Sequence, residues 1–495
     1  MNSSKSSPKH VNKTSFKVVS PFDLFYQLTY MSAMASSGIA RGRVFEIAAH
    51  STSPVAGYFV AINRLVEEMR YDYPEACRYV GLQAKSDNMK SFLLRQSDAL
   101  RSGEPLADFL AREAEVQGED YENEYERNLE ALKQWSNAFT SLTISVSLIV
   151  IIQVISSMIS SLNAPMMLML MGSGVAMATF GAYIIRRSAP REVFTVNPAK
   201  GSAEQRRAMQ LVRMIVPLGL MGAALLSLIG VPLGVILIGM AALLLPIGII
   251  SMKSDRLTSK KDEEFSTFMR SVGGTASSSG TTLKQALTRI DLSSFPTLES
   301  DIERLSKRLQ ALVEPELCWQ QFGLETGSKL ISEVVGIFYG AVKIGGDPER
   351  VGYLCSLFTS KTSRLRSKRR LTAGTFAGLS TVMQAVIAGL MIFVLSIVLN
   401  FAAMVTKMMP SSAAAAEGQT TINMGMASFT PDELQFLSNI TMGMVILMAF
   451  VTALAIILGD GGYKPKMALY LAMTIFISGV SMLVVPPIVA NVLTI

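Results

Sequence analysis

The sequence is poor in charged residues for its size. Only 17% of its 495 residues are Asp, Glu, Lys or Arg, whereas 50% are hydrophobic. Charged residues make up about a quarter of an average soluble domain. The apolar content excludes a disordered chain, and the low charge argues against an ordinary soluble domain. Together they indicate a membrane protein.

Residues that usually carry metal or acid–base chemistry are also scarce. The chain has two histidines, His10 and His50, and three widely spaced cysteines, Cys77, Cys318 and Cys355. Because no CxxC pair occurs, we expect reduced thiols buried as small hydrophobic groups rather than disulfides. The sequence offers no candidate catalytic residue, no metal site and no cofactor site.

Motifs of nucleotide and hydrolytic chemistry are missing as well. No Gly-Lys dipeptide exists, so there is no Walker A loop, and neither HExxH nor GxSxG appears. Gly459-Asp460-Gly461 resembles the GxGD element of intramembrane aspartyl peptidases, but Ile457 replaces its first glycine and no span holds a second aspartate. We interpret the segment as a helix-ending glycine with a polar turn, and we expect a protein that is not an enzyme.

Long apolar stretches dominate what is present. Seven of them are long enough to cross a bilayer as helices, which takes about 20 residues. None contains a charged residue or histidine, which argues against a proton or ion pathway. The predicted spans are 138–160 and 165–185 (a pair over 138–185), 214–230 and 233–250 (a hairpin over 214–250), 375–402, and 438–458 and 467–491 (a pair within 438–495).

Lys and Arg are unevenly distributed among the polar connections. The connection 186–213 is strongly basic, whereas 403–437 holds only Lys407 against three acidic residues. Because basic connections stay in the cytoplasm, we expect a cytoplasmic N-terminus, an external loop at 403–437 and an external C-terminus. Residues 1–20 lack an apolar core, so no cleavable signal peptide is expected.

Two large polar regions, 1–137 and 251–374, are predicted to be cytoplasmic helical bundles. Each contains an apolar stripe at helical spacing that begins just after a proline. Four features recur between the regions at an offset of 240 to 243 positions, which predicts a duplicated bundle. The stripes are Val55, Phe59, Ile62, Leu65 and Met69, and Leu298, Ile302, Leu305, Leu309 and Leu312; the recurring features are Pro54 and Pro296, Ser37-Gly38 and Ser279-Gly280, Arg64-Leu65 and Arg304-Leu305, and the Gly-acid-Pro elements.

The Gly-acid-Pro element occurs once in each polar region. Glycine permits the left-handed conformation that ends a helix, the acid can cap the next helix, and proline fits its first turn. We interpret both elements as helix–helix corners, with contact to a partner as the alternative. Their residues are Gly103, Glu104 and Pro105, and Gly345, Gly346, Asp347 and Pro348.

A basic run without acids, from Lys361 to Arg370, precedes the span at 375–402. It predicts a membrane-flanking segment that sets topology and contacts anionic lipid headgroups. A sharper hypothesis adds docking of an acidic cytoplasmic partner. Nucleic acid is not expected, because no aromatic residues interleave the charge. The candidate docking residues are Arg364, Arg366, Lys368, Arg369 and Arg370, with Arg186, Arg187 and Arg191 on the connection 186–213.

The second polar region resembles the type II secretion system F family, in its archaeal branch. The resemblance covers residues 255–404 well, and the bacterial three-span pattern does not fit the seven predicted spans. The segments that carry it are Thr275 to Gly280, Ile290-Asp291 before Pro296, Pro315 to Trp319, Glu325 to Gly327, Gly345 to Glu349 and the basic run.

The resemblance implies an all-α polytopic membrane protein with about seven transmembrane helices and two duplicated cytoplasmic helical bundles. Members of the family are platforms of type IV pilus-like machines, such as the archaellum. The resemblance implies coupling of a hexameric secretion ATPase to insertion of archaellin or pilin-like filament subunits, and it allows a homodimer. A seven-span transporter or channel is the alternative; a seven-span receptor would need an external N-terminus.

Overall fold

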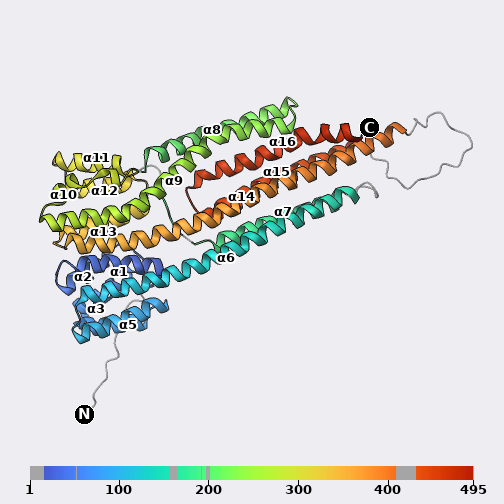
Figure 1. Ribbon diagram of the computed structural model, residues 1–495. Coiled ribbons are helices and arrows are strands. Elements are labelled where there is room, and N and C mark those ends of the chain that lie inside the picture. The colour runs from blue at the N-terminus through green and yellow to red at the C-terminus, as the bar shows by residue number, and fades with distance from the viewer. Residues whose placement is uncertain are drawn as a thin grey trace, which may run out of the picture. The chain divides into compact units, whose positions relative to one another are not determined.

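The computed structural model describes residues 16–51, 53–156, 164–190, 192–196, 201–408 and 431–493. Within these ranges the regular structure is helical, with no β-strand (Figure 1). Among the described residues, seven helices are long and apolar enough to cross a membrane. The predicted fold class, an all-α polytopic membrane protein with seven spans, is therefore confirmed.

The chain divides into two compact units. Residues 1–126 and 258–365 form the bundle unit, and residues 127–257 and 366–495 form the membrane unit. Three long helices, α6, α9 and α14, contribute residues to both units. The helices are α1 (Pro21–Ala35), α2 (Arg41–Ala49), α3 (Ala56–Met69), α4 (Tyr73–Leu82), α5 (Asp87–Ser102), α6 (Leu106–Ser156), α7 (Ala164–Ser188), α8 (Ala203–Leu228), α9 (Leu233–Ser279), α10 (Leu283–Arg289), α11 (Glu299–Gln310), α12 (Pro315–Glu325), α13 (Lys329–Lys343), α14 (Pro348–Met408), α15 (Pro431–Asp460) and α16 (Met467–Leu493), with short 3-10 helices η1 (Leu292–Ser294) and η2 (Lys464–Lys466).

The bundle unit contains the duplication that the sequence predicts. Helices α2, α4, α5 and α6 begin 242 residues before α10, α12, α13 and α14, respectively. Left-handed residues recur at the same offset, as Gly38 with Gly280 and Gly103 with Gly345. The match to Gly103 is thus Gly345, whereas the sequence pattern had paired it with Gly346. The first bundle is α1 to the start of α6, and the second is the end of α9 to the start of α14.

Both predicted apolar stripes lie on buried helix faces, except at their last residue. Val55, Phe59, Ile62 and Leu65 are buried around α3, as are Leu298, Ile302, Leu305 and Leu309 around α11. Met69 and Leu312, however, are 46% and 83% exposed. The reason is the same in both bundles: each helix ends there, at Arg70 and at Leu312, which both adopt a φ of 60°.

The two bundles pack together inside the bundle unit through α1, α6, α13 and α14. The rings of Phe25 on α1 and Phe358 on α14 are 4.7 Å apart. Asp108 on α6 forms an ion pair with Arg350 on α14, and these positions are themselves 242 residues apart. Contact between equivalent positions is what a local two-fold axis produces, so the bundles are arranged like the halves of a dimer.

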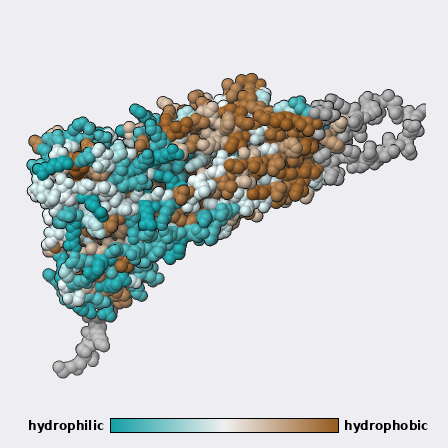
Figure 2. Space-filling view, viewed as in Figure 1, coloured by the Kyte–Doolittle hydropathy of each residue, from teal (hydrophilic) through white to brown (hydrophobic). Residues whose placement is uncertain are grey.

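The membrane unit is held by apolar packing and a few polar contacts. Helices α8 and α9 form the predicted hairpin, with Gly230 at a φ of 81° in the turn. Gln384 on α14 donates to Ser478 on α16 at 3.3 Å and accepts from Thr452 on α15 at 3.4 Å, so it joins three helices. Hydrophobic side chains cover the surface over α8 and α16 (Figure 2), as expected of helices that face lipid.

Candidate functional site

The basic run on α14 does not form one exposed patch. Arg366 and Arg369 are buried within the membrane unit, only 6% and 2% exposed. Arg366 donates through Nε to Glu192 at 2.7 Å, and Arg369 donates to the backbone carbonyls of Pro190 at 2.7 Å and Gly459 at 3.2 Å. Both guanidinium groups also lie over the ring of Phe194, 4.8 and 5.4 Å from its centroid.

Such contacts give these two arginines an internal role. A buried charge is tolerated only when it is paired and hydrogen-bonded, and both side chains meet that condition. They fasten the segment around Pro190 and the end of α15 to α14. The hypothesis that Arg366 and Arg369 contact a partner is therefore corrected: both lie inside the protein, where a partner cannot reach them.

A second group of buried charges lies near the end of α15. Lys466 Nζ is 3.1 Å from Asp255 Oδ2 and 2.8 Å from Asp460 Oδ2, and Arg370 is 3.9 Å from the same Asp255 oxygen. Lys466 therefore joins η2 to α9 and α15, and Arg370 brings α14 to the same aspartate of α9. Because Asp460 is an ion-pair partner at a helix end, the interpretation of its motif as a structural turn is confirmed.

Gly461 completes that turn. It follows the last residue of α15 with a φ of 65°, which favours glycine. A Cβ at this position would overlap the Arg369 guanidinium. The turn glycine and the buried arginine are therefore fitted to each other, which the sequence spacing between them could not reveal.

The remaining candidate docking residues are more accessible. Arg364 is exposed on α14, and Lys368 is half-buried. Arg186 and Arg187 are exposed in the last turn of α7. Arg191 lies outside the described residues. The seven candidates within the described residues thus divide into buried, half-buried and exposed side chains, and α14 carries members of all three groups.

Arg364 borders a cleft of about 360 Å³ in the bundle unit, between α1, α6 and α14. The base of the cleft is apolar, with the contacting rings of Phe25 and Phe358. Its rim carries charges of both signs, including an ion pair between Lys361 and Glu122 at 3.3 Å. The lining is completed by Thr29, Ala111, Arg112, Ala114, Glu115, Gly118, Tyr353, Leu354, Leu357 and Ser360.

An apolar base with a charged rim is typical of surfaces that bind another protein. The sequence had indicated only the α14 side of this cleft. The α6 side was missed, because Arg112, Glu115 and Glu122 form no run and look like an ordinary solvated helix face. The sequence indicates these α6 residues only through the repeat, which predicts that α6 and α14 occupy equivalent positions in the two bundles.

The structure places the two Gly-acid-Pro elements between α5 and α6 and between α13 and α14. Gly103 and Gly345 have φ values of 77° and 94° at the helix ends. In the second corner Asp347 accepts from the backbone N–H groups of Glu349 at 3.3 Å and Arg350 at 3.2 Å, which caps α14. In the first, Glu104 forms an ion pair with Arg112; Pro105 and Pro348 stand where α6 and α14 begin.

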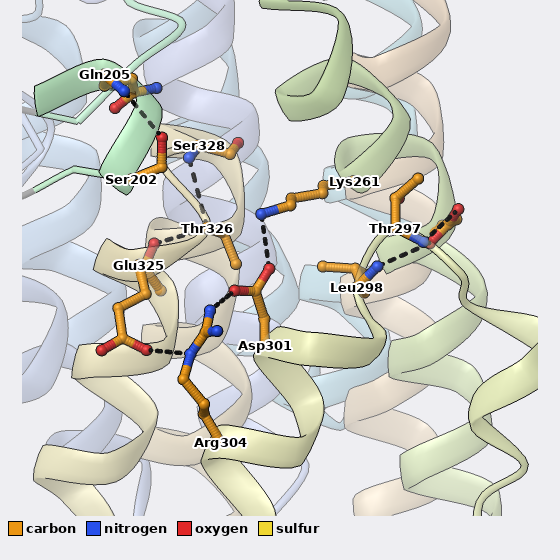
Figure 3. Close-up of polar contacts among 12 residues, drawn as sticks. Ser202, Gln205, Lys261, Thr297, Leu298, Asp301, Arg304, Glu325, Thr326 and Ser328 are labelled. Carbon is orange, nitrogen blue, oxygen red and sulfur yellow. Dashed lines mark hydrogen bonds and ion pairs between the residues drawn. The ribbon is translucent and has the colours of Figure 1, made fainter. Parts of the chain in front are cut away.

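A further charge cluster distinguishes the second bundle (Figure 3). Asp301 on α11 is 1% exposed and pairs with Lys261 on α9 at 2.7 Å and with Arg304. Arg304 reaches Glu325 on α12 at 3.2 Å, and Arg308 donates to the same carboxylate at 3.0 Å. The cluster ties three helices of the bundle together.

The pKa of Glu325 is set by two opposing effects. Partial burial raises the pKa, but hydrogen bonds from Arg308, Gln321 and Arg304 outweigh burial and hold the pKa below its usual value. The same contact with Glu325 raises the pKa of Arg308. These pKa directions favour the charged forms of Glu325 and Arg308, whose contacts join α11 to α12 within the second bundle.

Comparison with known proteins identifies the chain's relatives. A model of the family "Type II secretion system (T2SS), protein F" matches residues 28–154. The match lies on the first bundle and the span that follows, whereas the resemblance read from the sequence rested on residues 255–404.

Two archaeal proteins align with most of the chain. Flagella accessory protein J of Methanocaldococcus jannaschii is 24% identical over 435 residues, which is 85% of this chain and 75% of that protein. Flagella accessory protein J of Methanococcus voltae is 24% identical over 438 residues, covering 84% and 75%. No solved structure matches the chain. With seven apolar helices in the described residues, the chain is therefore a multi-pass membrane protein that is similar to the type II secretion system F family over residues 28–154 and to the archaeal flagella accessory proteins J over most of its length.

Proposed function

We propose that the protein is the membrane platform of an archaellum or related type IV pilus-like filament machine. In this role it couples a hexameric cytoplasmic secretion ATPase to insertion of archaellin or pilin-like filament subunits. One observation carries the proposal: α6, α9 and α14 each run without interruption from the bundle unit into the membrane unit. Movement imposed on the bundles is passed along continuous helices, which resist compression because every turn is hydrogen-bonded.

The proposal includes an orientation and a division of the chain. Both bundles, within 1–137 and 251–374, and the connection 186–213 lie in the cytoplasm, while 403–437 and the C-terminus are external. The remaining segments, 138–185, 214–250, 375–402 and 438–495, cross the membrane. The Lys/Arg bias supports this orientation, because basic connections are retained inside.

We further propose that the ATPase docks on the rim of the cleft between α6 and α14, with Arg364 as a contact. Arg364 is exposed and borders an apolar base, whereas Arg366 and Arg369 are buried. A rim charge of this kind steers an oppositely charged partner and contributes to its orientation. Arg186, Arg187 and Lys368 are accessible to anionic lipid headgroups or to the same partner. A homodimer is compatible with this arrangement.

The docking proposal is tested by co-purification of the full-length protein with its ATPase. We expect Arg364→Glu to weaken capture of the ATPase about tenfold and to reduce filament assembly, because it reverses a rim charge. The matched control is Lys90→Glu, which reverses an exposed charge on α5 away from the cleft. Unchanged capture and unchanged filaments after Arg364→Glu would remove the docking assignment.

A third variant separates docking from folding. Arg366→Ala takes the buried guanidinium away from Glu192, which is expected to cost about 3–5 kcal/mol. We therefore expect a low yield of membrane-inserted protein for Arg366→Ala and a normal yield for Arg364→Glu. The measurement is the amount of monodisperse protein after detergent extraction.

A further inference from the structure

A groove of about 400 Å³ lies in the membrane unit between α8, α9 and the start of α16. Apart from Lys464, its lining is apolar. The lining residues are Met209, Val212, Ile215, Val216, Gly219 and Leu220 of α8, Met240, Leu243 and Leu244 of α9, and Pro465, Met467, Ala468 and Leu471 beside Lys464. None of these residues lines the cleft between α6 and α14.

Basic side chains gather at one end of this groove. Lys464 lines the groove and is exposed. Arg206, Arg213 and Leu220 are spaced seven residues apart on α8, so successive members differ by only about 20° around the helix. Leu220 lines the groove, which puts the two exposed arginines on the same side of α8, toward its polar end. Glu204 is the only acid in α8.

Helix α8 is also the least covered of the seven spans: only 6% of its apolar window is buried. Its exposed side chains include Met214, Leu218, Met221 and Leu225. Gly219 faces open space in the groove, since a Cβ there would meet only Leu243, at 3.8 Å. The hollow beside α8 therefore opens toward the hydrocarbon phase of a membrane.

We propose that this groove binds an anionic membrane lipid, with one hydrocarbon chain along α8 and the headgroup at Lys464, Arg213 and Arg206. The apolar lining matches a chain, and the cationic end matches a phosphate group. A partner's transmembrane helix is the other occupant to consider. Such a helix is about 10 Å across, so it would pack against the outer face of α8 rather than enter a groove of about 400 Å³.

The test uses full-length protein in nanodiscs of phosphatidylcholine with a small fraction of phosphatidylglycerol that carries a photoreactive group in its acyl chain. After illumination, we expect the crosslinks to fall on peptides containing residues 209–220, 240–244 and 464–471. Gly219→Leu fills the groove and is expected to reduce these crosslinks about tenfold. Gly222→Leu makes the same change on the same helix, at a position that does not line the groove, and is expected to leave them unchanged.

Charge is tested with a second pair of variants. Arg213→Gln combined with Lys464→Gln is expected to abolish the preference for phosphatidylglycerol over a photoreactive phosphatidylcholine, while Arg207→Gln keeps it. Crosslinks spread evenly over the spans, or crosslinks that Gly219→Leu does not reduce, would overturn the proposal. So would capture of a partner's transmembrane helix that Gly219→Leu abolishes while lipid labelling stays unchanged.

Discussion

Arginines at nearby positions of the basic run have different roles. Arg364 and Arg369 belong to the same basic run, yet one is exposed and the other is 2% exposed. The buried one donates to two backbone carbonyls and stacks on Phe194. It therefore acts as a structural joint, and the glycine turn after α15 is shaped around it.

The first prediction concerns that turn. Gly461→Ala adds a Cβ that overlaps the Arg369 guanidinium and places alanine in the left-handed region, so we expect a loss of at least about 1–2 kcal/mol of stability. The matched control is Gly459→Ala, where the nearest atoms to a new Cβ are 3.7 Å away. The measurement is the apparent Tm in detergent, and equal values for the two variants would contradict the fitted turn.

The second prediction concerns the pH dependence of the cluster around Glu325. The pKa of Glu325 is lower in the folded protein than in the unfolded chain, where it is about 4.3. The contribution of Glu325 to stability is therefore present above the unfolded pKa and is lost as the pH falls through the folded pKa. We expect Glu325→Gln to reduce the protection of α11 and α12 from hydrogen exchange at pH 7. At a pH below both the folded and the unfolded pKa of Glu325, the wild type and the variant should exchange alike. A difference that persists at that pH would show that ionisation of Glu325 does not cause the effect.

At the residue scale, the sequence predicts the burial of the cysteines but not the different environments of the arginines in the basic run. It predicted buried reduced cysteines, and all three are buried and free. It could not separate Arg364 from Arg366, because burial of the second depends on Glu192, 174 residues away in the chain. Partners so distant leave no local periodicity.

At the scale of elements, the ends of α3 and α11 are the most informative feature. Among the described residues, only Arg70 and Leu312 combine a side chain with a positive φ. They occupy equivalent places in the two bundles, 242 residues apart. A non-glycine residue in the left-handed region costs roughly 1 kcal/mol, so both bundles retain the same strained corner.

The third prediction follows from that strain. Leu312→Gly is expected to stabilise the protein by about 0.5–1 kcal/mol, because Leu312 is 83% exposed and loses no packing. The control is Leu317→Gly, at a leucine inside α12 that is 54% exposed, which should destabilise the protein by about 1 kcal/mol. Apparent Tm values that shift in the same direction for both variants would contradict the account of the corner.

Element starts were more predictable than element ends. Proline after a capping position marked the beginning of α14, and Gly230 marked the turn between α8 and α9. The predicted apolar stripes extend one residue too far in both bundles, to Met69 and Leu312. The left-handed residues at these helix ends are Arg70 and Leu312 rather than glycine, so the sequence does not mark where either helix ends. Continuity of α6, α9 and α14 into the spans was also missed, because polar and apolar halves of one helix read as separate segments.

At the scale of the whole molecule, the described chain contains two bundles related by duplication and seven apolar helices that are long enough to cross a membrane. The polar region 251–374 is net positive and the region 1–137 is net negative. The second bundle holds the Asp301 cluster, whereas the α3 face of the first is formed by Tyr58, Phe59 and Ile62. The repeat was visible in the sequence through a few turn residues; its divergence in charge indicates that the bundles meet different surroundings.

The proposed platform function requires both bundles to lie on the cytoplasmic side of the membrane. Single cysteines introduced at Lys90 and Lys307 place exposed thiols on the first and second bundles. The native cysteines give little background because they are buried, and burial raises the pKa of Cys77 to about 12. Asp432→Cys, in the first turn of α15, is the external control.

The deciding measurement is labelling of these variants in intact cells with a membrane-impermeant maleimide. We predict labelling of the cysteine at position 432 in intact cells, and labelling of those at positions 90 and 307 only after the membrane is permeabilised. Labelling of either bundle in intact cells would place it outside, away from any cytoplasmic ATPase, and would contradict the proposed platform function.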